Sequence, residues 1–406
     1  MAKKAPLEGI RILDFTWAWA GPQASLILAL LGAEVIKVES RRRLDHSRLR
    51  SLVAGPLAGP DESFIFNTLN LNKLSVTLNL SQPRAVEIAK ALAQISDVVM
   101  ENMRPGVMDR LGLGYEALRA LKSDIIMLSS SAVGGTGPER LYTGYAPTFA
   151  AMGGLAYITG RPGGRPAPLM GAIDLRVGST GAFAVLAALY YHQRTGKGQY
   201  VDLSSAEAVS ALMGDTFMDY TMNGRVQERM GNLDQVMAPH GCYRCRAESE
   251  WVTIAVGSEE EWQSLCRVLG DQRLTEDERF ADGYSRRQNQ DDLDKIIGEW
   301  TASRSAQEVM QSLQSAGVAA MPVYDGPSLA QDAQVEARGF LTEVEHPAMG
   351  KKRVVGPMWR LSKTPAAIRR PASRLSCQFG PKVTGSPQAA GSSTECRPAL
   401  PNPPPT

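Results

Sequence analysis

The chain has 406 residues, which is enough for two or three domains with a sizeable core. Its 44 Lys and Arg residues nearly balance 42 Asp and Glu residues, and 43% of its residues are hydrophobic. This composition argues against a disordered chain and against a nucleic-acid binder. No apolar signal core opens the chain, and its most apolar early run, residues 24–33, is too short to span a bilayer. We therefore expect a cytoplasmic protein that binds neither nucleic acid nor membrane.

The first part of the chain alternates short apolar strands with helices, which is the pattern of a parallel sheet. The predicted strands are 10–15, 35–38, 75–78, 97–100, 125–128 and 200–203. The predicted helices are 22–31, one that begins near Pro83 with Ser81 as its cap, 115–121, 178–194, and one from Ser204 or Ser205 through Met222. The sequence thus predicts an α/β fold, with an open Rossmann-like sheet in a large domain whose first part spans residues 1–224.

The pattern changes after residue 224. Residues 224–250 are polar and irregular, and a strand at 251–256 precedes amphipathic helices near 259–269, 292–302 and 305–316. We expect a smaller α+β domain at 225–325, followed by a segment, 326–370, that returns to the large domain and holds a β-hairpin of 340–345 and 351–355. Residues 371–406 are rich in Pro, Ser and Gly, so we expect a disordered or aberrant tail there.

Few residues point to chemistry on their own. Cys242 and Cys245 form a single C-x-x-C, but no second pair has the spacing of a structural zinc site, so we expect no metal. The four histidines fit neither a Ser-His-Asp order nor H-E-x-x-H. Asp174 lies among glycine and aliphatic residues before a predicted long helix. It could use the amides at the helix start, or could only cap the helix, which periodicity alone favours.

Two further features concern anions. The turn 20–22 follows the first strand and opens a helix, which is where open α/β sheets bind ligands and where helix amides favour anions. Basic residues are frequent shortly afterwards, and such a run is either a solvated face or a phosphate site. These residues are Lys37, Arg41, Arg42, Arg43 and Arg48, with Lys73 and Arg104 further on.

Several motifs make the chain recognisable in combination. They are 7–16 (Leu-Glu-Gly-Ile-Arg-Ile-Leu-Asp-Phe-Thr), 20–22 (Ala-Gly-Pro), 31–39 (Leu-Gly-Ala-Glu-Val-Ile-Lys-Val-Glu), 72–73, 101–106 (Glu-Asn-Met-Arg-Pro-Gly), 134–138, the Asp174 segment, 195–199 and 317–323. In this order they resemble the class III CoA-transferases, the CaiB/BaiF-type family of formyl-CoA and crotonobetainyl-CoA:carnitine transferases. The resemblance covers about residues 7–370.

The resemblance implies an enzyme that transfers CoA from an acyl-CoA donor to a carboxylic acid acceptor. Asp174 matches the family's nucleophile, which forms a mixed anhydride and then an aspartyl-CoA thioester. The resemblance further implies that coenzyme A acts as a substrate, that no cofactor is permanently bound, and that the chain forms an interlocked, ring-like homodimer. CoA contacts are implied at Trp17, Ala18, Trp19, Ala20, Arg41, Lys73, Asn102, Met103, Arg104 and Tyr145, with Arg104 facing the CoA phosphates.

Two departures from the family pattern leave alternatives open. Formyl-CoA transferases have His-Val-Gln after the residue matching Thr16, whereas this chain has Trp17-Ala18-Trp19. The two indoles suggest a bulkier or more apolar acyl group, or they pack as core. The family also includes α-methylacyl-CoA racemases, and Tyr145 stands where their histidine follows a glycine. The alternatives to a transferase are therefore a racemase-like proton-transfer enzyme and a non-catalytic CoA-binding protein.

Overall fold

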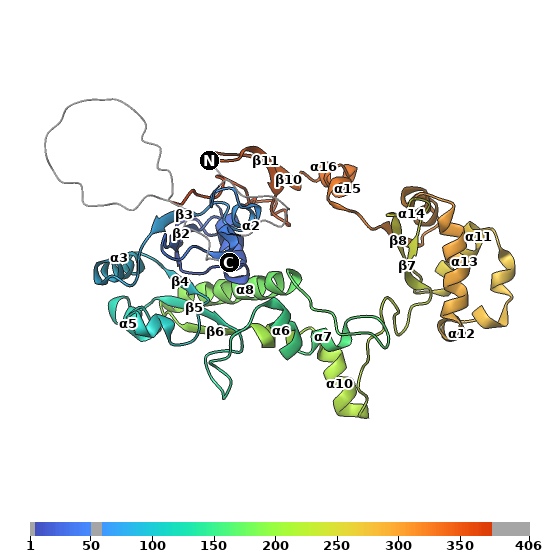
Figure 1. Cartoon of the computed structure of the whole chain (residues 1–406), viewed down its shortest axis with the longest axis horizontal. Coiled ribbons are helices and arrows are strands. Elements are labelled where there is room, and N and C mark those ends of the chain that lie inside the picture. Colours follow the sequence, from blue (N-terminus) through green and yellow to red (C-terminus); the bar gives the residue numbers. More distant parts are fainter. Residues whose placement is uncertain (1–4, 50–58, 376–406) are drawn as a thin grey trace, which may run out of the picture. The chain divides into compact units, whose positions relative to one another are not determined.

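The computed structural model describes residues 5–49 and 59–375 (Figure 1). By its contacts the chain divides into Met1–Ser376 and Cys377–Thr406, and the second part lies outside the described residues. The predicted tail therefore lies outside the described residues from residue 376 onward.

The large sheet has six parallel strands in the order β3-β2-β1-β4-β5-β6. The strands are β1 (Arg11–Asp14), β2 (Glu34–Glu39), β3 (Leu74–Thr77), β4 (Val98–Glu101), β5 (Ile126–Ser131) and β6 (Tyr200–Ser204). Ile12 of β1 pairs with Val35 on one side and with Val98 on the other. The predicted open parallel α/β sheet is confirmed. The strand order reverses between β1 and β4, so the loops after these two strands flank the crevice where such sheets bind ligands.

Helices cover both faces of this sheet because successive residues of a strand point to opposite sides. Ile12 lies in a core with α1 and α8, whereas Leu13 lies in a core with α3 and α5. The helices of this part are α1 (Ala20–Leu30), α2 (Phe64–Leu69), α3 (Pro83–Gln94), α4 (Val107–Arg110), α5 (Tyr115–Leu121), α6 (Ala146–Met152), α7 (Leu155–Ile158), α8 (Ala172–Thr195), α9 (Ser205–Ser210) and α10 (Gly214–Asn223), with a 3₁₀ turn η1 (His46–Arg48).

Helix α8 packs along α1, and two glycines on α8 permit the close approach. A Cβ at Gly178 would lie 2.7 Å from the carbonyl oxygen of Ala20, and one at Gly181 would lie 3.4 Å from the Cβ of Ala24, both on α1. By length and apolar composition α8 could cross a membrane, and 44% of its most apolar window is buried inside the protein. A core helix of a globular domain meets the same two criteria.

A second, three-stranded sheet has its own hydrophobic core around Trp262, Phe280 and Ile297. Its antiparallel strands are β7 (His240–Arg244), β8 (Trp251–Ala255) and β9 (Ala319–Pro322). The helices of this region are α11 (Glu259–Leu269), η2 (Gln272–Thr275), η3 (Glu278–Phe280), α12 (Gly283–Gln288), α13 (Gln290–Ala302) and α14 (Ala306–Ser315). Strand β7 lies within 224–250, a segment predicted to be irregular. The prediction missed this strand because His-Gly-Cys-Tyr-Arg lacks a clear apolar alternation.

The remaining described chain consists of α15 (Gly326–Ala330), α16 (Ala333–Ala337) and the predicted hairpin, β10 (Leu341–His346) and β11 (Gly350–Val355). It then runs along the large sheet's helices. The Asn72 amide donates to the carbonyl of Ala367 at 2.8 Å and accepts from the backbone of Arg369 at 2.6 Å. Residues 371–375, which the prediction assigns to the tail, are ordered against this surface: Ala372 is buried, and the Ser373 hydroxyl donates to the Lys73 carbonyl at 2.7 Å.

Three local predictions about helices are wrong. Helix α8 begins at Ala172 rather than at residue 178, so Asp174 lies inside its first turn. The helix predicted from Ser204 or Ser205 through Met222 breaks at Met213 into α9 and α10. Ser81 does not cap α3, because its hydroxyl donates to the side chain of Asn79, two residues before it.

Candidate active site

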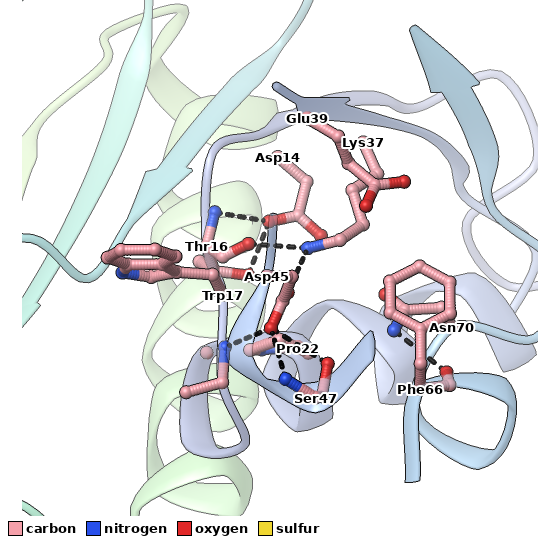
Figure 2. A network of polar contacts seen from close by, with 12 residues as sticks. Asp14, Thr16, Trp17, Pro22, Lys37, Glu39, Asp45, Ser47, Phe66 and Asn70 are labelled. Atoms are coloured by element: carbon pink, nitrogen blue, oxygen red, sulfur yellow. Dashed lines mark hydrogen bonds and ion pairs between the residues drawn. The ribbon is translucent and has the colours of Figure 1, made fainter. Parts of the chain in front are cut away.

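The loop between β1 and α1, residues 15–19, lies at the reversal point of the sheet and is held at successive residues (Figure 2). The Thr16 backbone N–H donates to the Asp14 carboxylate at 2.8 Å. The amide of Asn102, which follows β4, both accepts from the Trp17 N–H and donates to the Trp17 carbonyl, each at 2.9 Å. The Ala18 N–H donates to Asp45 at 2.9 Å, and Ala18 has a φ of +67°. This loop is therefore fixed before any ligand binds.

A buried network of opposite charges fixes the loop (Figure 2). Asp14 accepts from the Ser25 hydroxyl at 2.6 Å and lies 3.3 Å from the Lys73 ammonium. Burial alone would raise the pKa of Asp14, but Lys73 and Lys37 hold it below its ordinary value. Lys37 donates to the Thr16 carbonyl and lies 3.3 Å from Asp45. Each charge of this network thus has an opposite charge beside it.

Lys73 belongs to this network and not to an open ligand site. Its ammonium is buried and donates to the Pro22 carbonyl at 2.9 Å, to Ser25 at 2.8 Å and to Asn70 at 2.9 Å, besides its contact with Asp14. Burial lowers the pKa of Lys73 to about 8, against the opposing effect of Asp14. The contact between Lys73 and CoA that the family resemblance implies does not match this geometry, because the ammonium is already surrounded by acceptors.

The basic run after β2 likewise separates into two kinds of residue. Arg48 is buried, forms a two-pronged ion pair with Glu39 at 2.7 and 2.8 Å, and stacks 3.4 Å above the ring of Phe66. Arg41 and Arg43 are exposed in the loop between β2 and η1. Only the exposed arginines of this run can meet a ligand.

Asp174 has a different environment. Its carboxylate, in the first turn of α8, faces the backbone N–H of Ala20, the first residue of α1, which favours the charged form of the acid. Among the described residues it makes no ion pair. Burial raises the pKa of Asp174 to about 6, and the Ala20 N–H only partly offsets that effect. The residue before α8, Gly171, has φ +53°, a conformation that favours glycine, so the helix can start abruptly beside α1.

The Asp174 carboxylate therefore does not cap its own helix. The side chain of Asp174 reaches across to α1, so two helix N-termini, with their partial positive charge, meet at this half-buried acid. A carboxylate that is desolvated, unpaired and held by one amide is suited to nucleophilic attack.

Of the other predicted site residues, several surround the β1–α1 loop. Trp17 stacks on His46 with ring centroids 4.9 Å apart, and His46 lies 6.4 Å from Tyr145. The guanidinium of Arg43 lies 4.4 Å from the Trp17 ring centre. Trp19 is half-buried, and its carbonyl accepts from the Gln23 N–H in the first turn of α1.

The predicted residues after β4 divide by exposure. Met103 packs against the core of α3 and α5, and its N–H donates to the buried Glu101 carboxylate at 2.7 Å. Arg104 is exposed and borders an open groove of about 580 Å³. The groove is also lined by Leu141, Tyr142, Thr143, Thr148, Ala151 and Met152. Arg104 is therefore placed where it can meet a large anionic ligand.

Within residues 5–49 and 59–375 no three His, Cys, Asp or Glu side chains form a group that could hold a metal. Cys245 is buried in the core of the three-stranded sheet, and Cys242 is half-buried on β7. Sequence reasoning missed two residues that shape the site, Asp14 and Asp45. Asp14 could have been found, because an acid at the end of a buried strand indicates a buried ion pair. No comparable sequence feature marks Asp45.

Comparison with known proteins agrees with the fold. The model of CoA-transferase family III matches residues 7–376. Succinyl-CoA–D-citramalate CoA-transferase of Chloroflexus aurantiacus is 33% identical over 89% of this chain and 89% of its own length. Succinyl-CoA:glutarate CoA-transferase of Mus musculus is 33% identical over 91% of this chain and 84% of its own.

Solved structures give the same result. A CAIB/BAIF family protein from Brucella suis superposes with a TM-score of 0.83 at 29% identity, covering 92% of this chain and 97% of that protein. The fold, the sheet and the family model thus agree over nearly all of the described residues. The chain belongs to CoA-transferase family III.

Proposed function

We propose that the protein transfers CoA between an acyl-CoA and a free carboxylic acid with Asp174 as a covalent nucleophile. The activity itself follows from the family; the proposal concerns the route. The observation that carries it is the environment of Asp174: half-buried, without a cation among the described residues, and held by the first N–H of α1. A raised pKa makes the ionised carboxylate a stronger base and a stronger nucleophile.

The reaction has four balanced steps. An Asp174 oxygen forms a bond to the donor thioester carbon, the C–S bond breaks, and a mixed anhydride and CoA thiolate result. The thiolate then attacks the aspartyl carbon, which releases the donor acid and leaves an aspartyl-CoA thioester. The acceptor carboxylate attacks that same carbon and expels the thiolate again. Finally the thiolate attacks the acyl carbon of the new anhydride, which yields the new acyl-CoA and free Asp174. No net proton, metal or electron is required.

The positive ends of α1 and α8 support this chemistry. Each step passes through a tetrahedral oxyanion, and pre-oriented amide donors stabilise such charges. Ala20 and Asp174 are brought together by Gly178, whose missing side chain leaves room for the Ala20 carbonyl. The fixed loop at residues 15–19 keeps the start of α1 in place throughout the exchange.

We also propose that the substrates are short organic acids and their CoA esters. Relatives named as succinyl-CoA:glutarate, succinyl-CoA–D-citramalate and acetyl-CoA:oxalate CoA-transferases support that range. A panel of succinyl-CoA and acetyl-CoA as donors, with small mono- and dicarboxylic acids as acceptors, covers it.

The test is CoA exchange by the full chain and two variants. Asp174→Ala should lower transfer by more than about 1,000-fold because the nucleophile is gone. Asp215→Ala is the matched control, since Asp215 also lies in the first turn of a helix, α10, and should leave transfer unchanged. Transfer that survives Asp174→Ala would refute the covalent route. Deuterium entering Cα of a 2-methylacyl-CoA without transfer would instead identify a proton-transfer enzyme.

We further propose that the working form is a homodimer. Helices α8 and α10 each expose large apolar side chains, among them Phe183 and Met222, both 72% exposed. Contiguous exposed apolar side chains mark protein interfaces more often than solvent-facing surface. Light scattering on the purified chain should give twice the monomer mass; a monomer at micromolar concentration would contradict this proposal.

A further inference from the structure

The indole of Trp17 does not present a purely apolar wall. The Arg43 guanidinium lies 4.4 Å from the ring centre, and the His46 imidazole stacks on the indole at 4.9 Å. Tyr145 lies beside His46 and is 65% exposed. The Trp17 ring is thus contacted by one permanent cation and by one imidazole, a side chain that can donate a hydrogen bond. These neighbours of Trp17 favour a polar partner at this indole over an apolar one.

The backbone beneath these side chains is fixed. Trp17 is held on both its N–H and its carbonyl by Asn102. His46 opens the turn η1, which Asp45 caps by accepting from the Ser47 N–H at 2.9 Å. Asp45 and Ser47 are buried, whereas His46 keeps part of its surface open. The imidazole is therefore displayed on a rigid turn and not on a mobile loop.

Arg43 is available for a ligand. Among the described residues no acid forms an ion pair with it, in contrast to Arg48 of the same run, which pairs with Glu39. Stacking on Trp17 limits the guanidinium to a few orientations without using its N–H donors. A planar fork of this kind matches a carboxylate.

Trp17 lies close in sequence to Ala20, whose backbone N–H faces the carboxylate of Asp174. Trp17 precedes Ala20, the residue that holds Asp174, by three positions, so their Cα atoms are at most about 10 Å apart. The phosphates of CoA, by contrast, are separated from the thioester by the whole pantetheine arm. A carboxylate at the far end of a short acyl group lies much nearer to the thioester than the phosphates do, and it is the anion that we assign to Arg43.

We propose that Arg43, with His46, binds the far carboxylate of a dicarboxylic acyl group and so selects dicarboxylic over monocarboxylic substrates. This assignment rests on the proposed function, because it places the thioester at Asp174. It names Arg43 as a specificity-determining residue, and Trp17 as the surface that positions it.

The experiment compares two donors of equal chain length, succinyl-CoA and butyryl-CoA, which differ in the far carboxylate. Steady-state transfer is measured for the full-length protein, Arg43→Met and Arg43→Lys. Arg119→Met is the control, because Arg119 also lies over an aromatic ring, that of Tyr115 at 6.0 Å, but on α5. Equilibrium binding of both donors to Asp174→Asn, with and without Arg43→Met, supplies a readout that is independent of turnover.

Arg43→Met should lower kcat/KM for succinyl-CoA by about 10- to 100-fold and leave butyryl-CoA within about twofold. Arg43→Lys should have a kcat/KM for succinyl-CoA between those of the natural chain and Arg43→Met. Arg119→Met should leave kcat/KM unchanged for both donors. Equal losses with both donors would overturn the assignment, because they indicate contact with CoA itself, and so would no loss with either. Donor-selective binding to Asp174→Asn, together with no transfer by the natural chain, would support Arg43 while refuting the proposed function. No binding of either donor to the natural chain or to Asp174→Asn would refute both.

Discussion

Two carboxylates flank the same loop and have opposite environments. Asp14 is fully buried beside Lys73, with Lys37 nearby, and its pKa lies below the ordinary value. Asp174 is half-buried, has one amide for a partner, and has a pKa of about 6. The two environments distinguish a carboxylate with a structural role from one that is suited to catalysis. Where opposite charges compensate burial, a carboxylate holds the fold; where burial is left uncompensated, the carboxylate keeps its reactivity.

The largest expected effect is on the structural side of this comparison. Asp14→Ala leaves Lys73 buried without its counter-charge, so we expect the free energy of unfolding to fall by about 3–5 kcal/mol. Urea unfolding measures it. The double variant Asp14→Ala/Lys73→Met should lose less than the sum of the two single variants, because neither charge is then left alone. Strict additivity would mean that the two charges do not compensate each other.

A second prediction concerns how α1 and Asp174 are brought together. Gly178→Ala places a methyl group 2.7 Å from the Ala20 carbonyl oxygen and should cost about 1–3 kcal/mol of stability as α8 shifts. Transfer activity should fall with it, since Ala20 holds Asp174. Gly298→Ala on α13 is the control: nothing lies within 4 Å of the added methyl group, so a gain of about 0.5–1 kcal/mol is expected. Equal effects of the two substitutions would contradict a close helix contact.

The third prediction concerns the pH dependence of the reaction. The proposed route requires ionised Asp174, so it predicts that kcat/KM rises with pH up to about 6 and then levels off. Glu101 is the group to exclude, because burial raises its pKa to about 7. In Glu101→Gln, kcat/KM should still rise with an apparent pKa near 6. If kcat/KM of the natural chain rises with an apparent pKa near 7, and this rise is absent in Glu101→Gln, the pH dependence belongs to Glu101 instead.

The smallest effect is on stability as a function of pH. The pKa of Asp174 is raised on folding from 3.8 to about 6, so between these values the folded protein binds more protons than the unfolded chain. Its stability therefore declines as pH rises from about 4 to 6. Asp174→Asn lacks this titration and should gain on the order of 1 kcal/mol relative to the natural chain across that range. The melting temperature of Asp174→Asn minus that of the natural chain should therefore increase from pH 4 to pH 6. A decrease in this difference over that range would contradict the raised pKa.

Local patterns in the sequence were sufficient for much of the fold. Strand β1, helix α11 and the hairpin follow from apolar periodicity and turn residues, and their positions in the structure match within one or two residues. Helix α8 was predicted six residues too short because Gly178 and its small neighbours weaken the helical pattern. The error matters, since it left Asp174 outside the helix whose N-terminus it occupies.

The site was harder to predict because its charges pair across long sequence separations. Nothing near Lys73 in sequence shows that Asp14 lies beside it. Glu39 is close to Arg48 in sequence, but the sequence does not show that the two form a buried ion pair. The run of basic residues therefore gave no means to separate the exposed Arg43 from Lys37 and Arg48, which form buried ion pairs. The residues around Asp174 were enough to single it out, but periodicity favoured a capping role, and only the family motifs indicated a nucleophile.

The most direct test of the account is to trap the covalent intermediate. The full-length protein is incubated with succinyl-CoA and hydroxylamine, digested, and analysed by mass spectrometry. An aspartyl thioester or anhydride converts Asp174 to its hydroxamate, so the peptide with that residue should carry the modification. It should be absent without donor and absent in Asp174→Asn. Turnover with an unmodified Asp174, or with the hydroxamate on another acid such as Glu101, would contradict the assignment of Asp174 as the nucleophile.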